Sequence, residues 1–335
     1  MYADFGHVAC FAALLRAYER ARRAKRGRGG EPLFHRDLER ELLRLESSLL
    51  AQSWHPAPYR FFWLRKTKAR LVSEATFAGR VVHHALVAEL ERVWEPAFIA
   101  DSYACRRGKG THVALRQAQL LCRRFPFAMR LDVEKYFDSI DHSVLCALLA
   151  QRNDSGCQWL CERIVRAAAV PTVAGDLGRA IPIGNLTSQF FANVYLHPLD
   201  EMVNAEWPGY PYLRYMDDVL VFGADKAVLW VIAEACGDLL ARHGLRLRRS
   251  VTAVFPITEG VPWLGMRVFP ATIRLQREGR TRFVGKLRAA LSSDRGEEAA
   301  RSRLSSLCGH VQHASTLRLR RSLLSSMACR DFSLT

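Results

Sequence analysis

The sequence predicts an α+β fold in which an antiparallel sheet carries helices and the chain ends in a helical lobe. Three observations support this class. "YLRYMDDVLVFG", residues 212–223, has strand-forming residues that alternate on both sides of a tight turn, as in a β-hairpin. "FAMRLDV", residues 127–133, is a second apolar strand. Helical apolar spacing fills much of the remainder, and neither an internal repeat nor a linker splits the chain.

The elements before residue 127 follow from apolar spacing and helix-end signals. Apolar residues three to four positions apart predict a helix beginning near Phe5 and another over 38–49. Between these helices, "ARRAKRGRGGEP" is a basic, glycine-rich loop that cannot pack a core. The remaining elements of this part are a strand-like stretch over 59–72, a helix over 74–94, and a helix that Thr111 caps and that runs to Arg124.

The elements after residue 133 follow from the same signals. A turn leads to a helix beginning near Asp141, and a loop with glycine and proline leads to "IPIGNLTSQFFANVYL". The other elements expected here are helices over 156–168 and 225–243, the short strands "LRLRR" and "WLGMRVF", and basic amphipathic helices from Phe283 onward.

The charge balance favours a polyanionic partner. The 335 residues include 49 Lys and Arg against 33 Asp and Glu, which gives a net charge of +16. Such an excess opposes compaction unless something neutralises it, so simple solubility is the weaker explanation. The nine scattered cysteines do not form a disulfide framework, and neither an apolar signal core nor a run of membrane-spanning length occurs. We therefore expect a cytoplasmic protein that binds nucleic acid and not a membrane.

Three aspartates form the strongest chemical pattern. Asp217 and Asp218 lie side by side at the predicted hairpin tip, where their repulsion requires compensation, and Asp132 ends another apolar strand. Adjacent acids also suit an ordinary exposed turn. However, carboxylates that converge from rigid strands can hold the two divalent ions of phosphoryl or nucleotidyl transfer, and Mg²⁺ prefers such oxygen ligands.

Seven segments resemble, in order, the motifs of reverse transcriptases. Tyr215-Met216-Asp217-Asp218 is similar to the YxDD motif of that family, and "LDVEKYFDSI" resembles its first metal-binding motif. The other matching segments are "KARLVSEATFAGRVVHHAL", "SYACRRGKGTHVAL", "IPIGNLTSQFFANVYL", "LRLRRSVTAVFP" and "VPWLGMRVFP", so the resemblance spans about residues 60–268. It implies a right-hand polymerase fold and RNA-directed DNA synthesis.

The resemblance also implies how the chain divides and which metals it uses. The expected parts are an N-terminal helical extension with a basic loop (1–54), fingers (55–127), a palm (128–268) into which fingers helices are inserted at about 143–180, and a small helical thumb (269–335). Asp132, Asp217 and the backbone carbonyl of Val133 are expected to hold two Mg²⁺ ions, with Asp218 in support. Mn²⁺ is a possible substitute for Mg²⁺.

Further site residues carry over from the family motifs. The residues expected to bind the dNTP are Lys68, Arg70, Arg80, Phe137, Ile183, Gly184 and Gln189. The aromatic ring of Phe137 favours dNTPs because it occupies the space of a ribose 2′-hydroxyl. The residues expected to contact template or primer are Arg106, Arg107, Lys109, Trp263, Leu264 and Gly265. Asp141 is expected to cap a helix, and His83 and His84 to be packing residues.

The middle motif points to a subgroup. Most reverse transcriptases carry a QGxxxSP-like form, whereas residues 183–189 here read IGNLTSQ. That form resembles the reverse transcriptases of diversity-generating retroelements, which misincorporate at template adenines. The resemblance implies an RNA template, a cDNA or RNA primer, a structured element RNA and a small basic oligomeric accessory protein as partners. Alternatives are a defence-associated, abortive-infection or retron-type reverse transcriptase, and a non-catalytic RNA-binding protein with the same fold.

Overall fold

The structure is a computed structural model that describes residues 1–23, 25–65, 69–167, 178–291, 305–309, 311 and 314–322. The chain forms two compact units. The first consists of residues 1–106, 133–206 and 235–248, and the second of residues 107–132, 207–234 and 249–335. The four-part division expected from the sequence stays a prediction.

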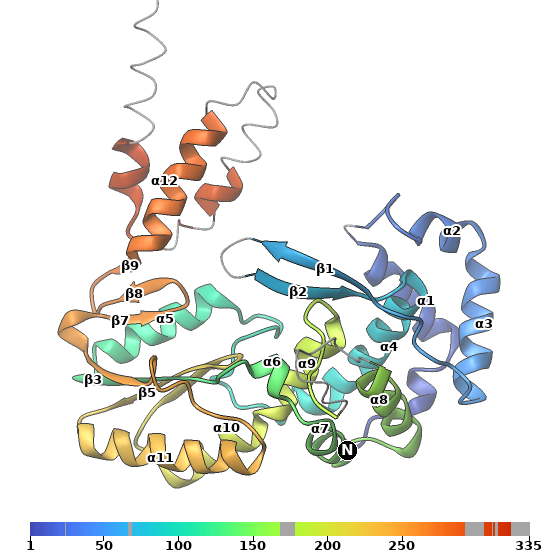
Figure 1. Cartoon of the computed structure of the whole chain (residues 1–335), viewed down its shortest axis with the longest axis horizontal. Helices are drawn as coiled ribbons and strands as arrows, with labels where there is room; N and C mark the ends of the chain where they lie inside the picture. The colour runs from blue at the N-terminus through green and yellow to red at the C-terminus, as the bar shows by residue number, and fades with distance from the viewer. Residues whose placement is uncertain are drawn as a thin grey trace, which may run out of the picture. The chain divides into compact units, whose positions relative to one another are not determined.

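The first unit is mainly helical and has a two-stranded antiparallel hairpin (Figure 1). The hairpin pairs β1 (Arg60–Arg65) with β2 (Ala69–Glu74). Helix α4 (Phe77–Trp94) is central, because most of its residues are buried and α1 and α9 both pack against it. Thr76 caps α4 by accepting a hydrogen bond from the Gly79 amide. The other helices of this unit are α1 (Phe11–Arg22), α2 (Glu31–Arg36), α3 (Leu38–Leu50), α6 (Tyr136–Ser139), α7 (His142–Ala150), α8 (Ser155–Ala167), α9 (Leu186–Tyr195) and α10 (His197–Glu206).

The second unit is built on a four-stranded antiparallel sheet of order β4-β5-β3-β6. Its strands are β3 (Phe127–Asp132), β4 (Tyr212–Tyr215), β5 (Asp218–Gly223) and β6 (Ala253–Pro256). A second sheet, of three strands, contains β7 (Val261–Trp263), β8 (Met266–Val268) and β9 (Ile273–Leu275). Helix α5 (Thr111–Cys122) contacts β4 and β8, and α11 (Lys226–Arg242) begins in this unit.

The helical C-terminal lobe has its own small core in the described residues. Phe283 and Leu287 of α12 (Arg277–Leu291) pack with Val311, and Leu275, Leu307 and Leu319 surround them. The sequence prediction of an antiparallel sheet that carries helices, followed by a helical lobe, is confirmed.

Four details differ from the sequence predictions. Thr111 does not cap the helix that follows it, because Gly110 is the N-cap of α5 and Thr111 is the first helical residue. The first helix begins at Phe11 and not near Phe5, because Asp4 caps a separate short 3-10 helix over Phe5–His7. "LRLRR" makes only an isolated bridge between Leu247 and Val133, and the strand of this region is β6. "WLGMRVF" is two strands and not one, since Leu264 and Gly265 both have positive φ and form a two-residue hairpin turn.

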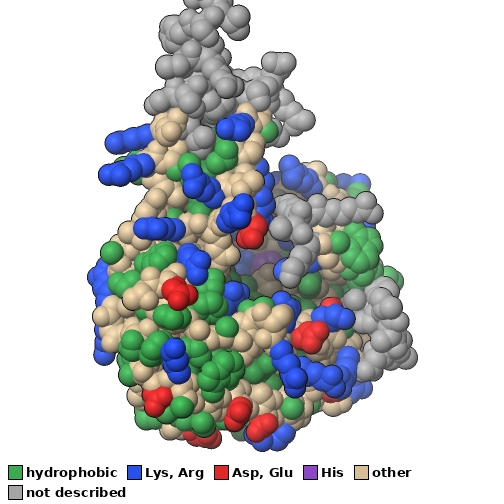
Figure 2. Space-filling view, turned by 60° about the vertical axis from the view of Figure 1, so that its left-hand side comes forward, with side chains coloured by type: hydrophobic (Ala, Val, Ile, Leu, Met, Phe, Trp, Pro, Cys, Tyr) green, Lys and Arg blue, Asp and Glu red, His purple; other side chains and the backbone are tan. Residues whose placement is uncertain are grey.

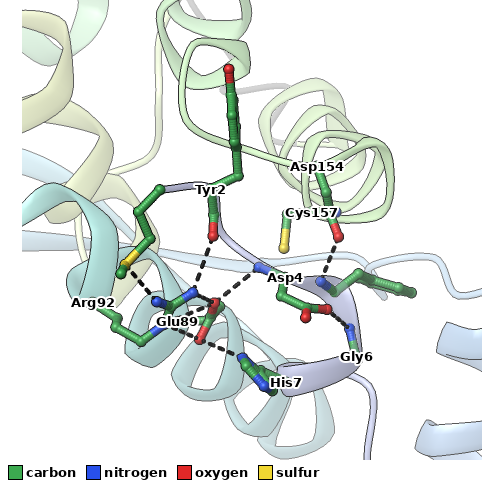
Figure 3. A network of polar contacts seen from close by, with 10 residues as sticks. Tyr2, Asp4, Gly6, His7, Glu89, Arg92, Asp154 and Cys157 are labelled. Carbon is green, nitrogen blue, oxygen red and sulfur yellow. Dashed lines mark hydrogen bonds and ion pairs between the residues drawn. The ribbon is translucent and has the colours of Figure 1, made fainter.

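The N-terminal segment of the first unit is fastened to α4 and to the start of α8 (Figure 3). The Asp4 amide donates to Glu89 (2.9 Å), and the Phe5 amide donates to Asp154 (2.7 Å). Glu89 is buried and also accepts hydrogen bonds from Arg92, whose guanidinium reaches the Tyr2 carbonyl as well. One buried carboxylate therefore joins the chain start to the central helix.

The surface agrees with the positive net charge. Figure 2 shows Lys and Arg side chains scattered over the face drawn there, with fewer Asp and Glu side chains. Among the helices that the structure describes, none combines the length and apolar content needed to cross a bilayer. The cysteines in the described ranges are free thiols, as the sequence predicted.

Candidate active site

The structure places Asp132 and Asp218 opposite each other on neighbouring strands. Strand β3 ends at Asp132 and the antiparallel strand β5 begins at Asp218, and these two residues are register partners. Side chains directly opposite in an antiparallel pair have Cβ atoms about 5 Å apart. Asp132 is buried, and Asp218 is partly buried. The pairing of these two carboxylates, predicted from separate motifs, is therefore a property of the sheet.

Asp217 lies in the two-residue turn between β4 and β5. Tyr215 pairs with Asp218 across this turn, so only Met216 and Asp217 connect the strands. Met216 has φ +58, a left-handed conformation that is uncommon for residues other than glycine. The turn is held on both sides: buried Arg214 donates to the Met216 carbonyl (3.2 Å), and the Thr111 hydroxyl donates to the Tyr215 hydroxyl (3.1 Å). Asp217 is thus presented at a tip that the surrounding structure constrains.

Arg130 forms a two-point ion pair with Asp218. Its Nε lies 2.9 Å from Oδ1, and its Nη2 lies 2.8 Å from Oδ2. Burial raises the pKa of Asp218 to about 6; Arg130 opposes this shift, and the negative charges of Asp132 and Asp217 add to it. Arg130 was not among the residues predicted from the sequence, although its position two residues before Asp132 on the same strand places it on the same face.

The carboxylate cluster fits a divalent metal that shares its ligands with a substrate. Within the described ranges, no three His, Cys, Asp or Glu side chains are already arranged as a metal cage. Asp218 is instead paired with Arg130. Mg²⁺ does not need such a cage, because it is commonly bound by one or two carboxylates, waters and substrate phosphates. Asp132 and Asp217 as those carboxylates, and Val133 as a backbone ligand, stay predictions.

A pocket of about 320 Å³ in the first unit brings together three residues predicted to bind the dNTP. Arg80, Gly184 and Gln189 all line it, together with both histidines of α4. Burial lowers the pKa of His83 to about 3 and that of His84 to about 4, so both are neutral at pH 7. The described lining does not include the side chains of Arg70, Phe137 or Ile183, and Lys68 lies outside the described residues.

The charges at this pocket converge on Glu74. Its carboxylate accepts from Arg60 and from Lys25 (3.3 Å), and Arg80 approaches it to 4.0 Å. The hydrogen bond from Arg60 lowers the pKa of Glu74, with Lys25 in support, so this carboxylate is ionised at neutral pH. Arg80 therefore lines the pocket and shares the carboxylate of Glu74 with Lys25 and Arg60. Neither Lys25 nor Glu74 was singled out from the sequence, because neither belongs to a recognisable spacing.

Gly184 and Asn185 join the pocket wall to the hairpin. The Ser73 amide donates to the Ile183 carbonyl (2.8 Å), which extends the edge of β2 by one bridge. Asn185 is buried, donates to the Ser73 hydroxyl (3.0 Å) and accepts from the Ala75 amide (3.3 Å). Asn185 is a positioning residue that the sequence analysis missed, since its partners lie more than a hundred residues away.

We expect Gly184→Ala to disrupt this wall. Gly184 has φ +122, and a Cβ there would lie 2.5 Å from the Ser73 carbonyl oxygen and 2.7 Å from Val72 Cγ1. The substitution should raise the KM for dNTP and lower the free energy of unfolding by about 2 kcal/mol. Primer-extension kinetics and urea unfolding measure both, with Gly209→Ala as the control because open space surrounds that glycine. Equal behaviour of the two variants would contradict the assignment.

Comparison with known proteins agrees with this geometry. The family model described as "Reverse transcriptase (RNA-dependent DNA polymerase)" matches residues 62–268, more than half of the chain. The chain belongs to the reverse transcriptase family. Strands β3, β4 and β5, with all three aspartates, lie inside the matched segment of this reverse transcriptase.

Individual relatives of this reverse transcriptase are distant. Protein YkfC of Escherichia coli is 24% identical over 270 residues, which are 68% of this chain and 71% of YkfC. The group II intron-encoded protein LtrA of Lactococcus lactis is 26% identical over 175 residues, which are 49% of this chain and 28% of LtrA. A solved structure of telomerase from Candida albicans aligns with 84% of this chain and with 56% of the telomerase chain, at 12% sequence identity and a TM-score of 0.48.

Two residues predicted to contact template or primer have buried side chains. The Arg106 side chain is only 6% exposed and binds Glu95 and the carbonyls of Ile99 and Ser102, so a template phosphate finds no free donor there. Trp263 has no exposed surface and belongs to the core of the reverse transcriptase. Burial limits what either side chain can offer a nucleic acid, and it depends on neighbours that the motif does not reveal. Contact of these two residues with template or primer stays a prediction.

Four other predicted residues keep accessible positions. Arg107 is exposed, and Lys109 is partly exposed just before α5. Leu264 and Gly265 form the tip of the β7–β8 turn, where the backbone is accessible. Their contacts with template or primer stay predictions. The capping role predicted for Asp141 is confirmed, since its carboxylate accepts from the Ser143 and Val144 amides at the start of α7.

Proposed function

We propose that the chain synthesises DNA on an RNA template. The observation that carries this proposal is the register pairing of Asp132 with Asp218, with Asp217 in the adjoining two-residue turn, inside the segment that matches the family. In the reaction, the primer 3′-hydroxyl attacks the α-phosphate of a dNTP, a new phosphodiester bond forms and pyrophosphate leaves. The net charge of +16 supports binding of template and primer.

In this proposal, different residues of the chain hold the metal ions, bind the triphosphate and exclude ribonucleotides. Divalent ions, Mg²⁺ above all, supply charge neutralisation at the reacting oxygens when they are bound. Asp132 and Asp217 would hold them, supported by the chemistry of the donor set. Arg80 would bind the triphosphate, because a guanidinium fork pairs with phosphate oxygens. Phe137, which is partly buried and packs edge-on against Tyr136, would exclude a ribose 2′-hydroxyl.

The setting that we propose is a diversity-generating retroelement. Its support is the IGNLTSQ form of residues 183–189, where an apolar Ile183 replaces a glutamine and Gln189 replaces a proline. An apolar side chain offers no hydrogen bonds near the nascent pair, and fewer directional contacts weaken discrimination against wrong geometry. In that setting the enzyme acts with a structured element RNA and a small basic oligomeric accessory protein.

Primer extension with sequencing of every product tests this proposal. We expect the purified protein, given Mg²⁺, dNTPs and an RNA template that contains all four bases, to misincorporate at adenines roughly tenfold more often than elsewhere. Ile183→Gln should reduce that excess, and Ile257→Val, a conservative change in the other unit, should not. Faithful products would point instead to a defence-associated, abortive-infection or retron-type enzyme. No product, even with candidate RNA and accessory protein, would favour a non-catalytic RNA-binding protein.

A further inference from the structure

We propose that Arg130 is a positioning residue of the carboxylate cluster. It holds Asp218 in a two-point ion pair beside Asp132 and Asp217, the carboxylates proposed above to take divalent ions. The inference rests on the proposed function of the site. It gives Arg130 a role in the site beside the three aspartates, and it distinguishes the role of Asp218 from that of Asp217.

The geometry of the sheet places Arg130 where this role requires it. Arg130 and Asp132 are two positions apart on β3, so their side chains share one face of the sheet. Asp132 lies opposite Asp218, and Arg130 lies opposite Leu220, which makes Arg130 and Asp218 diagonal neighbours. A long side chain spans that diagonal. The result is a fork in which each guanidinium nitrogen meets its own carboxylate oxygen, at 2.9 and 2.8 Å.

The ion pair between Arg130 and Asp218 is partly shielded from solvent. The Arg130 side chain is 22% exposed and that of Asp218 is 17% exposed. Charges that are partly removed from water are screened less by solvent and salt than exposed surface pairs. Two parallel N–H···O bonds also fix the orientation of the carboxylate, which a single lysine contact does not. Arg130 therefore compensates one negative charge of the cluster and restricts where Asp218 can point.

Different effects follow from removing the charge and from removing the fork. Without the guanidinium, Asp218 loses the ion-pair partner that compensates its burial, so the metal-free protein becomes less stable and a divalent cation gains more by binding beside this carboxylate. With the charge kept but the fork lost, stability is retained, yet Asp218 is no longer held in one orientation. Turnover then falls because the carboxylate geometry around the reacting atoms varies.

Three variants of the full chain separate these effects. Arg130→Gln removes charge and fork, Arg130→Lys keeps the charge alone, and Arg116→Gln removes the same charge from an exposed position of α5 in the same unit. Each is measured for Tm in EDTA and in Mg²⁺, for Mn²⁺ affinity by electron paramagnetic resonance, and for the kcat and KM of dNTP incorporation.

We expect the Tm of Arg130→Gln in EDTA to lie about 4 °C or more below that of the wild type. Mg²⁺ should restore part of this loss of Tm. The variant should also bind Mn²⁺ about tenfold more tightly than the wild type does. Arg130→Lys should keep the Tm and Mn²⁺ affinity of the wild type but lose about tenfold in kcat at unchanged KM. Arg116→Gln should match the wild type throughout.

Two results would overturn the inference. One is an Arg130→Gln protein whose EDTA-to-Mg²⁺ difference in Tm and whose Mn²⁺ affinity equal those of Arg116→Gln. The other, which decides the matter if Arg130→Gln does not fold, is an Arg130→Lys protein with the kcat of the wild type. A wild type that makes no product refutes the proposed function separately, and the Tm and Mn²⁺ comparison still decides the role of Arg130.

Discussion

Replacing Asp217 by Asn lowers dNTP incorporation by about 1,000-fold or more, because it removes a carboxylate from the site where charge must be neutralised during transfer. Asp217 lies in a two-residue turn that hydrogen bonds of Arg214 and Tyr215 hold in place. The amide has nearly the same size, and the fold should tolerate it. RNA binding should stay close to that of the wild type, since it depends on distributed positive charge.

Single-nucleotide incorporation on a primed RNA template measures this loss, and a filter-binding assay measures RNA affinity. Asp138→Asn is a matched control, because Asp138 is exposed and the substitution changes the charge in the same way. Its rate should equal that of the wild type. Synthesis that persists in Asp217→Asn would refute the assignment of the site. A parallel loss of RNA affinity would instead indicate that the substitution disturbed the fold.

Glu89→Gln is expected to lower the free energy of unfolding by about 2 kcal/mol at pH 7. Glu89 is 6% exposed and accepts from the Arg92 guanidinium at 2.6 Å and from the Asp4 amide at 2.9 Å (Figure 3). The loss stays moderate because Arg92, at 39% exposed, remains partly solvated, and because the glutamine carbonyl can still accept from the Asp4 amide. Urea unfolding of both proteins measures the difference.

The difference in the free energy of unfolding between the wild type and Glu89→Gln should depend on pH. Burial alone raises the pKa of Glu89, but the hydrogen bonds from Arg92 and Asp4 outweigh burial, so its pKa lies below the usual value. A carboxyl whose pKa is lower in the folded than in the unfolded state stabilises fully above the unfolded value of about 4.3. That contribution is lost as pH falls through the folded value, so the gap between wild type and Glu89→Gln should narrow below about pH 4.

Glu19→Gln is the control for this experiment, since Glu19 is an exposed acid on α1. It should leave the free energy of unfolding within about 0.5 kcal/mol of the wild type at both pH values. A constant difference between Glu89→Gln and wild type across the pH range would mean that the carboxylate charge of Glu89 is not what stabilises the folded state.

Local patterns were enough to predict much of the site. Alternating apolar residues around Asp217 and Asp218 specified a hairpin, and the register of β4 and β5 places Asp217 in its turn and Asp218 at the first position of β5. An apolar run ending at Asp132 specified the neighbouring strand. The cap at Asp141 was also predictable, because a helix N-cap depends on residues two or three positions away.

Other features depend on partners that are distant in the sequence. Arg130 meets Asp218 across 88 positions, and Asn185 meets Ser73 across 112. Arg106 and Trp263 carry motif positions that suggested contact with nucleic acid, yet both side chains are buried. Whether a charged or aromatic side chain faces solvent depends on how helices and sheets pack around it, and one sequence contains no periodic signal for that.

The sequence by itself determined the order of strands and helices that carry the site, the three aspartates and the positive charge, because these follow from short-range spacing and composition. Only the tertiary structure decided that Arg130 holds Asp218, that Glu89 fastens the chain start to α4, and that Arg106 is a structural residue. The physical reason is the same for all three. An ion pair or a buried hydrogen bond forms where packing brings two groups within about 3 Å, and packing is set by the whole chain.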